Sequence, residues 1–359
     1  MEIIKRNVSV DILRILLAFM VVTIHIGAPS TGNVINQITW MPNKLFAYFV
    51  HYSSIPAVNI YILISGYFSY KQLESKNVFK KAISLWMILF FYSVVGFTLS
   101  IIFFNESFTV NSLIHRVFLL STGEWWFMTN YFCLLLLSPF LNTIISSLTK
   151  KTFSCFFCFV VIIFGILPAF DEWKDPIGLN YGYSLIWFIP LYIIGGGIKR
   201  FSLGIKNKGF QKFFFMYILM TFVILAQEIF FAKILHMANN AFSHYNSFTI
   251  LLQAIFLFLA FVNLKIGGGK INNVIVFISS LSLSVYIFHC QTDISKVLWN
   301  ITTPSQYADS IYLPLVYISL LLGVFIIACL TEYLRKQLFK ALKIEKIPSR
   351  IVNFFSKTL

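Results

Sequence analysis

Three ionisable residues interrupt an otherwise apolar segment near the start of the chain. Asp11, Arg14 and His25 lie within SVDILRILLAFMVVTIHIGAPSTG, which reads as a helix from Val10 to about Gly27. Charged groups are expensive inside a membrane-spanning helix, and those that occur there usually serve a function. An imidazole titrates near neutral pH, so the first chemistry that this segment offers is proton transfer by His25.

The spacing of these residues places them on one side of the helix. Arg14 and His25 are eleven residues apart, which at about 100° per residue is about 20° beyond three full turns, and about 16 Å along the axis. Asp11 precedes Arg14 by three residues, in position for an ion pair. We therefore expect a polar stripe that faces the interior of a helix bundle. The alternative is that Arg14 and His25 extend separately towards the two membrane surfaces.

Further ionisable residues lie in or at the ends of other apolar runs. His51 and His289 fall near the same predicted boundary as His25, and Glu124 precedes a pair of tryptophans there. Each is a candidate contact at the same site, and the alternative is a hydrogen-bonded or solvated residue at the interface. Glu228 lies in the middle of an apolar run, where either a structural hydrogen bond or a functional role would explain it.

The cysteines and the remaining histidines predict no metal site. All five cysteines lie in or at the ends of apolar runs, and the pair Cys155 and Cys158 has no second pair and no histidine nearby. We interpret them as small apolar side chains. His236 and His244 lack the spacing and the acidic companions of a metal site.

The composition indicates that the solvent of this chain is lipid. The residues are 58% hydrophobic and 11% charged, with a mean hydropathy of +0.81, so too few polar residues remain to cover a water-facing surface. Repeated apolar runs of about 20 residues are typical of membrane-spanning helices rather than of barrel strands. The sequence predicts an all-α, polytopic integral membrane protein with about ten spans, at residues 10–27, 45–68, 82–104, 126–148, 152–169, 184–198, 213–235, 248–264, 272–290 and 311–330.

The distribution of positive charge predicts the orientation. Most of the 28 Lys and Arg residues fall in alternate loops between the apolar runs, which places both termini in the cytoplasm. The net charge of +15 lies in these short clusters, so nucleic-acid binding is excluded. The chain divides into a membrane domain at residues 1–335 and a basic amphipathic tail at residues 336–359, expected on the anionic inner leaflet.

Five sequence features in order resemble the type-3 membrane acyltransferases, integral membrane enzymes that acylate cell-surface sugars and lipids. The first is Arg14 followed after ten residues by His25. The others are a helix ending in Ser-Gly-Tyr, two Trp-Phe helices and a Ser-x-Tyr-x-x-His helix, which read IPAVNIYILISGYFSY, EWWFMTNYFCLLLLSPFLN, SLIWFIPLYIIGGGIKR and SLSLSVYIFHC. Many members carry an Arg-x-x-Arg pair after the second helix, whereas this chain departs from that pattern with KNVFKKA.

The resemblance implies an O-acyltransferase that uses acyl-CoA, most often acetyl-CoA, and holds no permanently bound cofactor. The acceptor would be a hydroxyl of a cell-envelope or exported polysaccharide, or of its lipid-linked precursor. His25 is the candidate general base, and a transient acyl-imidazole is the alternative. Arg14, Lys80 and Lys81 are candidates for binding the phosphates of CoA. The other candidate site residues are Asp11, His51, Glu124 and His289.

The expected location is the plasma membrane, or inner membrane, of a bacterium, as the Lys- and Phe-rich composition suggests. Two other functions fit an apolar chain with intramembrane charges. One is a transporter or flippase for a glycan or lipid intermediate, although the two halves show no matching repeat. The other is a membrane glycosyltransferase that uses a loop carboxylate among Asp171, Glu172 and Asp175.

Overall fold

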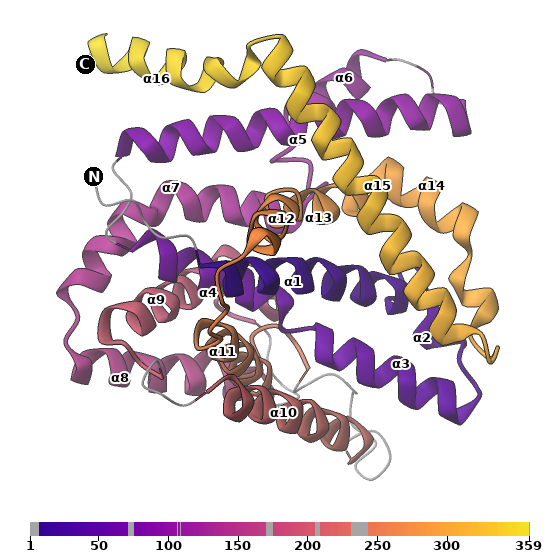
Figure 1. Cartoon of the computed structure of the whole chain (residues 1–359), viewed down its shortest axis with the longest axis vertical. Coiled ribbons are helices and arrows are strands. Elements are labelled where there is room, and N and C mark those ends of the chain that lie inside the picture. Colours follow the sequence, from indigo (N-terminus) through magenta and orange to yellow (C-terminus); the bar gives the residue numbers. More distant parts are fainter. Residues whose placement is uncertain are drawn as a thin grey trace.

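The chain folds into a bundle of α-helices (Figure 1). The computed structural model describes residues 7–70, 75–105, 107, 109–169, 175–204, 209–230 and 243–358. This part of the chain contains no strand, which confirms the predicted all-α class.

Eight helical segments of the described chain are long and apolar enough to cross a membrane. Two predicted spans are shorter helices, α9 (Leu185–Phe201) and α11 (Phe248–Val262). All ten predicted runs therefore contain helix, and eight reach spanning length. The eight segments are α1 (Val8–Gly27), α3 with α4 (Met41–Ser54 and Ala57–Ser69), α5 (Ser75–Phe104), α7 (Trp126–Ser147), α8 and the turns after it (Lys150–Ala169), α10 (Phe210–Phe230), α12 with α13 (Lys270–Ser279 and Leu283–Cys290) and α15 (Leu313–Ala341).

Short helices connect or follow these segments. They are α2 (Val34–Gln37), α6 (Val110–Val117), α14 (Thr292–Thr302) and α16 (Ile347–Thr358). The last long helix, α15, continues beyond the predicted domain boundary at residue 335. After it, α16 packs beside α5 (Figure 1). Placement of this basic tail on the inner leaflet stays a prediction.

Helix α1 lies at the centre of the bundle and contacts α3, α4, α12, α13 and α15 (Figure 1). It begins where the side chain of Asn7 accepts the N–H of Ser9 at 3.1 Å, and it has no proline or glycine before Gly27. The loop after it turns back, so that the N–H of Gly32 donates to the carbonyl of His25 at 2.8 Å. A Cβ at Gly32 would lie 2.3 Å from the carbonyl oxygen of Ile26, so only glycine permits this close return.

Helices α4 and α9 pack closely because glycine faces backbone on both of them. A Cβ at Gly66 would lie 2.0 Å from the carbonyl oxygen of Tyr192, and a Cβ at Gly195 would lie 2.3 Å from that of Leu63. Small residues at such contacts let membrane helices approach closely. Gly195, the first residue of the Gly195–Gly197 run, therefore permits the close approach of α9 to α4.

The ninth predicted span is broken into α12 and α13 at residues 280–282. Polar groups of other helices bond to the start of the break. Asp11 of α1 accepts the hydroxyl of Ser279 at 2.9 Å, and Lys336 of α15 donates to the carbonyl of Ser280 at 2.9 Å. These contacts stabilise irregular backbone within an apolar bundle. The result is a separate eight-residue helix, α13, whose last turn lies beside the end of α1.

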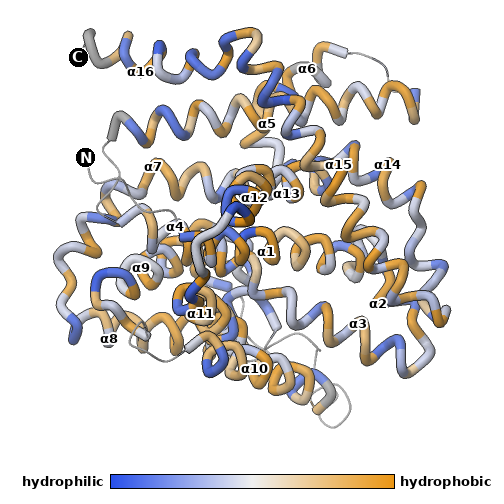
Figure 2. The backbone as a smooth tube through the Cα atoms, viewed as in Figure 1, coloured by the Kyte–Doolittle hydropathy of each residue, from blue (hydrophilic) through white to orange (hydrophobic). Residues whose placement is uncertain are grey.

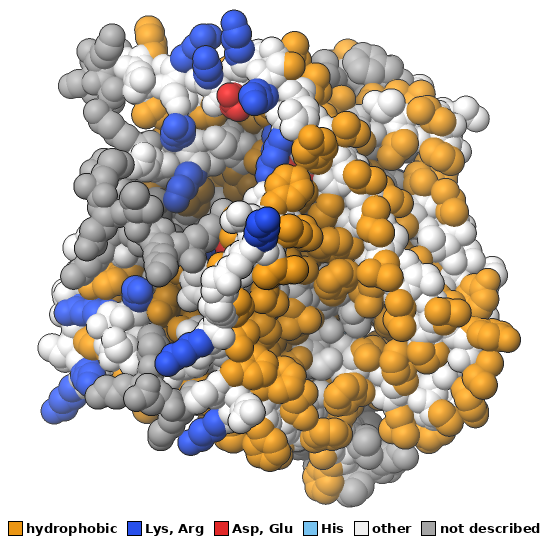
Figure 3. All heavy atoms as spheres, viewed as in Figure 1, with side chains coloured by type: hydrophobic (Ala, Val, Ile, Leu, Met, Phe, Trp, Pro, Cys, Tyr) orange, Lys and Arg blue, Asp and Glu red, His pale blue; other side chains and the backbone are white. Residues whose placement is uncertain are grey.

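Apolar and basic residues occupy different parts of the surface. Figure 2 shows apolar residues along most helices, and hydrophilic stretches along α16 and towards the left-hand end of α5. On the face drawn in Figure 3, hydrophobic side chains cover the centre and right, and Lys and Arg side chains gather towards the left. A wide apolar surface with charge at one edge is typical of a membrane-spanning protein.

Candidate active site

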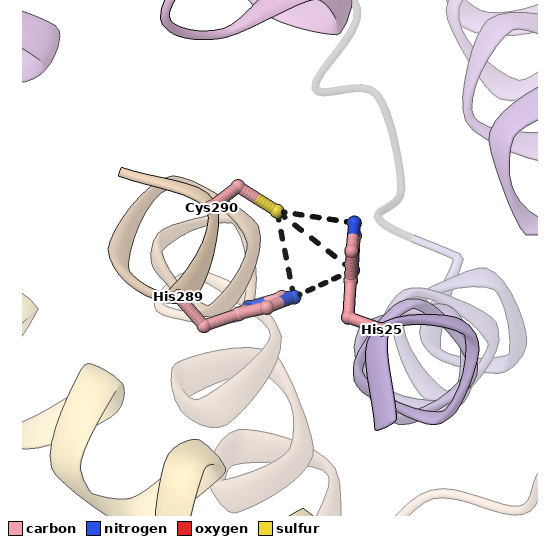
Figure 4. A group of neighbouring side chains, drawn as sticks. All are labelled: His25, His289 and Cys290. Atoms are coloured by element: carbon pink, nitrogen blue, oxygen red, sulfur yellow. Dashed lines mark hydrogen bonds between the residues drawn. The ribbon is translucent and has the colours of Figure 1, made fainter. Parts of the chain in front are cut away.

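Two histidines from distant parts of the sequence meet at the ends of α1 and α13. His25 Nδ1 lies 3.0 Å from His289 Nε2, and Figure 4 shows the two side chains directed towards each other from separate helices. Each Nδ1 also bonds to the backbone carbonyl four residues earlier, that of Val21 at 2.9 Å for His25 and that of Val285 for His289. A carbonyl only accepts hydrogen bonds, so both Nδ1 atoms carry the proton. His289 Nε2 therefore accepts from His25 Nδ1–H, and His25 Nε2 keeps a lone pair.

The thiol of Cys290 completes a group of three. Its Sγ lies 3.8 Å from His25 Nδ1, 3.7 Å from His25 Nε2 and 3.5 Å from His289 Nε2 (Figure 4). His289 is buried, whereas His25 and Cys290 are partly exposed. From the sequence this thiol is interpreted as a small apolar side chain, because one cysteine in an apolar run matches no motif. Its position next to His289 was the available signal.

Residues at the start of α7 hold the end of α13. The buried indole of Trp125 donates from Nε1 to the carbonyl of Ile287 at 3.0 Å. This bond satisfies one of the last carbonyls of α13, which have no partner within the helix. Gln291 follows α13 directly, and its Oε1 accepts the N–H of Ile294 at 2.7 Å, which caps α14. These contacts fix the corner between α13 and α14, at which His289 and Cys290 lie.

Glu124 acts on the same corner through Gln291. Its Oε1 accepts from Gln291 Nε2 at 2.6 Å and lies 3.3 Å from Arg116 Nη1, while Arg116 Nη2 lies 2.7 Å from Asp293 Oδ2. Burial raises the pKa of Glu124, and the Gln291 amide and the Arg116 guanidinium oppose that rise. No described hydrogen bond joins Glu124 to either histidine of the site. Sequence reasoning missed Arg116, Gln291 and Asp293, which lie far from Glu124 or inside a polar loop.

Asp11 and Arg14 form the predicted ion pair at the opposite end of α1. Arg14 Nη1 lies 2.8 Å from Asp11 Oδ1. Asp11 is buried, and the side chain of Arg14 is 32% exposed. The hydroxyl of Ser279 also donates to Asp11. A buried carboxylate is tolerable when it is paired and hydrogen-bonded in this way.

Arg14 and His25 share a face of the unbroken helix α1, as their spacing predicts. Between them that face carries Ala18 and Val21, which are both buried in the hydrophobic core. The predicted polar stripe is therefore two separate polar groups with a packed apolar stretch between them.

The lysine candidates lie apart from this helix. Lys80 and Lys81 are exposed on the first part of α5, and no described hydrogen bond or ion pair joins them to Arg14. His51 of α3 is close to the end of α1, because a Cβ at Gly27 would lie 3.3 Å from its Nδ1. That nitrogen is buried, and among the described residues it has no hydrogen-bond partner.

The other carboxylates singled out from the sequence lie elsewhere. Glu228 is buried on α10 and is hydrogen-bonded to Tyr52. Asp171 and Glu172 lie outside the described residues. Asp175 accepts two backbone N–H groups of the following turn, each at 2.7 Å, so it serves as a turn cap.

The fold and the site define a polytopic membrane protein that holds a partly exposed imidazole near the end of its central helix. A family model described as an acyltransferase domain matches residues 7–333 of the 359. The chain belongs to this type-3 acyltransferase family and is a membrane acyltransferase that transfers groups other than aminoacyl groups. No curated protein and no solved structure matched the chain.

Proposed function

We propose that the protein is an O-acyltransferase, and more narrowly an O-acetyltransferase, that uses cytosolic acyl-CoA. Its acceptor is a hydroxyl of a cell-envelope or exported polysaccharide, or of the lipid-linked precursor of that polysaccharide. The single observation that carries the proposal is the hydrogen bonding of His25. Its two Nδ1 contacts leave Nε2 unprotonated, and an unprotonated ring nitrogen is the base that transfer to a hydroxyl requires.

In this mechanism His25 Nε2 takes the proton of the acceptor hydroxyl while the hydroxyl oxygen attacks the thioester carbonyl. The imidazolium that forms keeps its Nδ1–H between the Val21 carbonyl and His289 Nε2. Both are acceptors, so they stabilise the new positive charge. When the tetrahedral intermediate collapses, the C–S bond breaks and Nε2 returns the proton to the departing CoA sulfur. The alternative route forms an acyl-imidazole by attack of Nε2 on the thioester.

Arg14 is the proposed contact for the phosphates of the donor. Its guanidinium is partly exposed and uses Nη1 for Asp11, and a guanidinium has five N–H donors in a fork that matches phosphate oxygens. Arg14 and His25 are about 16 Å apart along the helix axis. A donor bound at Arg14 must therefore reach His25 through an extended arm, which the pantetheine chain of acyl-CoA provides. Lys80 and Lys81 are proposed only as additional positive charge at the same membrane surface.

The charge distribution supports the proposed orientation in a bacterial plasma membrane. Lys and Arg side chains gather at one edge of the face drawn in Figure 3, and positive charge favours the cytoplasmic side. With α9 and α11 counted as short spans, ten crossings would put both termini on the same side of the membrane, and the positive charge favours the cytoplasmic side. His25 then lies near the outer surface, where an exported acceptor arrives.

The test is acyl transfer by membranes that contain the full-length protein. Membranes with wild-type protein, His25→Ala, Arg14→Ala or His244→Ala are incubated with labelled acetyl-CoA and a panel of envelope glycans, and products are identified by mass spectrometry. His244 is the matched control, because it is a histidine whose ring centroid lies 4.3 Å from that of Tyr181, and no described hydrogen bond joins its side chain to His25, His289 or Cys290.

The wild type and His244→Ala are expected to add acetyl mass to a glycan. Arg14→Ala is expected to need more acetyl-CoA, and His25→Ala to lose about 10²–10⁴ in rate. Full activity of His25→Ala would refute the role of the imidazole. An added sugar mass, or retention of unmodified glycan inside the cell with no acetyl transfer, would refute acyl transfer itself.

A further inference from the structure

Three possible metal-ligand atoms lie close together at the end of α1 and form a compact triangle. Its edges are 3.0 Å from His25 Nδ1 to His289 Nε2, 3.5 Å from His289 Nε2 to Cys290 Sγ, and 3.8 Å from Cys290 Sγ to His25 Nδ1. Among the described residues, no other group of three histidine, cysteine or carboxylate side chains brings its ligand atoms this close together. His25 lies 264 positions from His289, so the fold and not a local motif brings it to the neighbouring pair His289 and Cys290.

The triangle matches one face of a tetrahedral metal site. Zinc binds imidazole nitrogen at about 2.0–2.1 Å and thiolate sulfur at about 2.3 Å. In a tetrahedron these bond lengths give N···N edges of about 3.4 Å and N···S edges of about 3.6 Å. The observed edges of 3.0, 3.5 and 3.8 Å differ from these values by a few tenths of an ångström. Rotation of the side chains by a small angle is enough to correct such differences.

We propose that His25, His289 and Cys290 form a binding site for a soft divalent transition-metal ion of the Zn²⁺ class. A site with two imidazole nitrogens and one thiolate selects such ions over Mg²⁺ and Ca²⁺, which bind oxygen ligands instead. The Val285 carbonyl holds the Nδ1–H of His289, the outer hydrogen bond that orients a metal-binding histidine. His25 and Cys290 are partly exposed, so an ion has access, and a fourth position remains for water.

Occupation of this site inhibits the acyl transfer proposed above, and this part of the inference rests on that proposed function. In the metal-free enzyme His25 carries its proton on Nδ1 and offers the lone pair of Nε2. A metal ion bound to Nδ1 displaces that proton, which moves through water to Nε2, while the Cys290 thiol releases its proton to solvent. His25 Nε2 then has no lone pair for the acceptor hydroxyl. The metal thus switches the ring to the tautomer that cannot act as a base.

Direct metal binding is the decisive experiment, because it needs no acyl transfer. Purified full-length protein in detergent, carrying no polyhistidine tag, is dialysed against Zn²⁺ or Co²⁺, and bound metal is measured by mass spectrometry. We expect about one ion per chain, and for Co²⁺ an absorption band from sulfur-to-metal charge transfer. Cys290→Ser and His289→Gln should weaken binding by more than the roughly 10–100-fold that loss of an outer hydrogen bond costs. Cys329→Ser, a partly exposed cysteine on α15, is the matched control and should bind like the wild type.

The inhibition is then measured as a zinc titration of acyl transfer, with each variant compared with its own rate in chelator. Cys290→Ser should need a higher zinc concentration for half-inhibition than the wild type and Cys329→Ser. Size-exclusion profiles establish which variants fold, and two different ligand substitutions protect the test against failure of either one. No bound metal in the wild type, or equal binding by the wild type and both ligand variants, overturns the metal site and leaves the proposed function intact. Metal binding without acyl transfer by any assay overturns the proposed function and leaves the metal site intact.

Discussion

The contact between His289 and His25 lets us predict how much the substitution His289→Ala slows acyl transfer. In His289→Ala the Nδ1–H of His25 loses the acceptor 3.0 Å away but keeps the Val21 carbonyl at 2.9 Å. His25 therefore keeps its tautomer and its basic Nε2, and it loses only part of the stabilisation of the imidazolium. The substitution should weaken the transition state and leave the binding of acyl-CoA unchanged.

The size of the loss follows from the strength of one hydrogen bond to a charged group. Such a bond contributes about 1.5–3 kcal/mol, and each 1.36 kcal/mol changes a rate about tenfold. We expect kcat of His289→Ala to fall by about 10–150-fold with little change in KM for acetyl-CoA. His25→Ala, which removes the base itself, should lose about 10²–10⁴-fold. His289→Gln places an amide oxygen near the same position and should recover part of the lost rate.

The assay is the initial rate of label transfer from acetyl-CoA to the glycan, in chelator and with protein that elutes as a single peak. The reasoning would be refuted if His289→Ala kept the full wild-type rate. It would also be refuted if the loss appeared in KM instead of kcat, since His289 would then contact the donor. Failure of His289→Gln to exceed His289→Ala would show that an acceptor atom at this position is not what matters.

Three further predictions concern the scaffold around the site. Asp11→Asn removes the charge that pairs with Arg14 at 2.8 Å and should lower the free energy of unfolding by about 1–3 kcal/mol. Ser279→Ala removes one neutral donor to the same carboxylate and should lower it less, as measured by thermal unfolding monitored by tryptophan fluorescence. The reverse order would contradict the assignment of the ion pair as the stronger contact of Asp11. Gly66→Ala brings a Cβ within 2.0 Å of the Tyr192 carbonyl and should lower the free energy of unfolding by at least about 1–3 kcal/mol through overpacking. Gly323→Ala adds a Cβ with no heavy atom within 4 Å and should leave the melting temperature equal or higher. Equal melting temperatures for both variants would show that α4 and α9 separate easily. Burial raises the pKa of Glu124 above its ordinary 4.5, so the folded state binds this proton more tightly than the unfolded state. The stability from that binding is present below pH 4.5 and is lost as the pH rises through the folded pKa. Relative to Glu124→Gln, the wild type should therefore lose stability between pH 4 and pH 7 in the same unfolding assay, and a constant difference across that range would contradict the raised pKa.

Much of the architecture could be predicted because it depends on the solvent. Apolar runs of spanning length must form helices in lipid, since their backbone groups have no other partners there, and all ten runs contain helix. The glycines of α9 were also predictable, because small residues permit close helix approach. The first turns of α5 were not predicted, since KNVFKKA is too polar for an apolar span yet still forms helix before the span begins. The short helices α2 and α14 were missed for the same reason, as they lie in segments interpreted as polar loops.

The site could be predicted only in part. The pairing of Asp11 with Arg14 follows from helix geometry, which acts over three residues. The meeting of His25 with Cys290 depends on where α13 ends after the break at residues 280–282, and no local pattern contains that information. Even the apolar stretch at Ala18 and Val21 was readable in the sequence, yet the shared face of Arg14 and His25 suggested a continuous polar surface instead. Residues such as Arg116 and Asp293 matter only through the corner that they stabilise.

The bond between Asp11 and Ser279 has a consequence for how the protein is made. The two residues are 268 positions apart, so the first span emerges from the ribosome long before its partner exists. At about 5–20 residues per second, a carboxylate and a guanidinium wait in or near the bilayer for roughly 13–54 s before α12 arrives. During that interval Arg14, on the same helix, is in place to pair with the Asp11 carboxylate and lower the cost of its burial. A defect in this pair should therefore appear first as degradation of newly inserted chains, before any finished enzyme can be assayed.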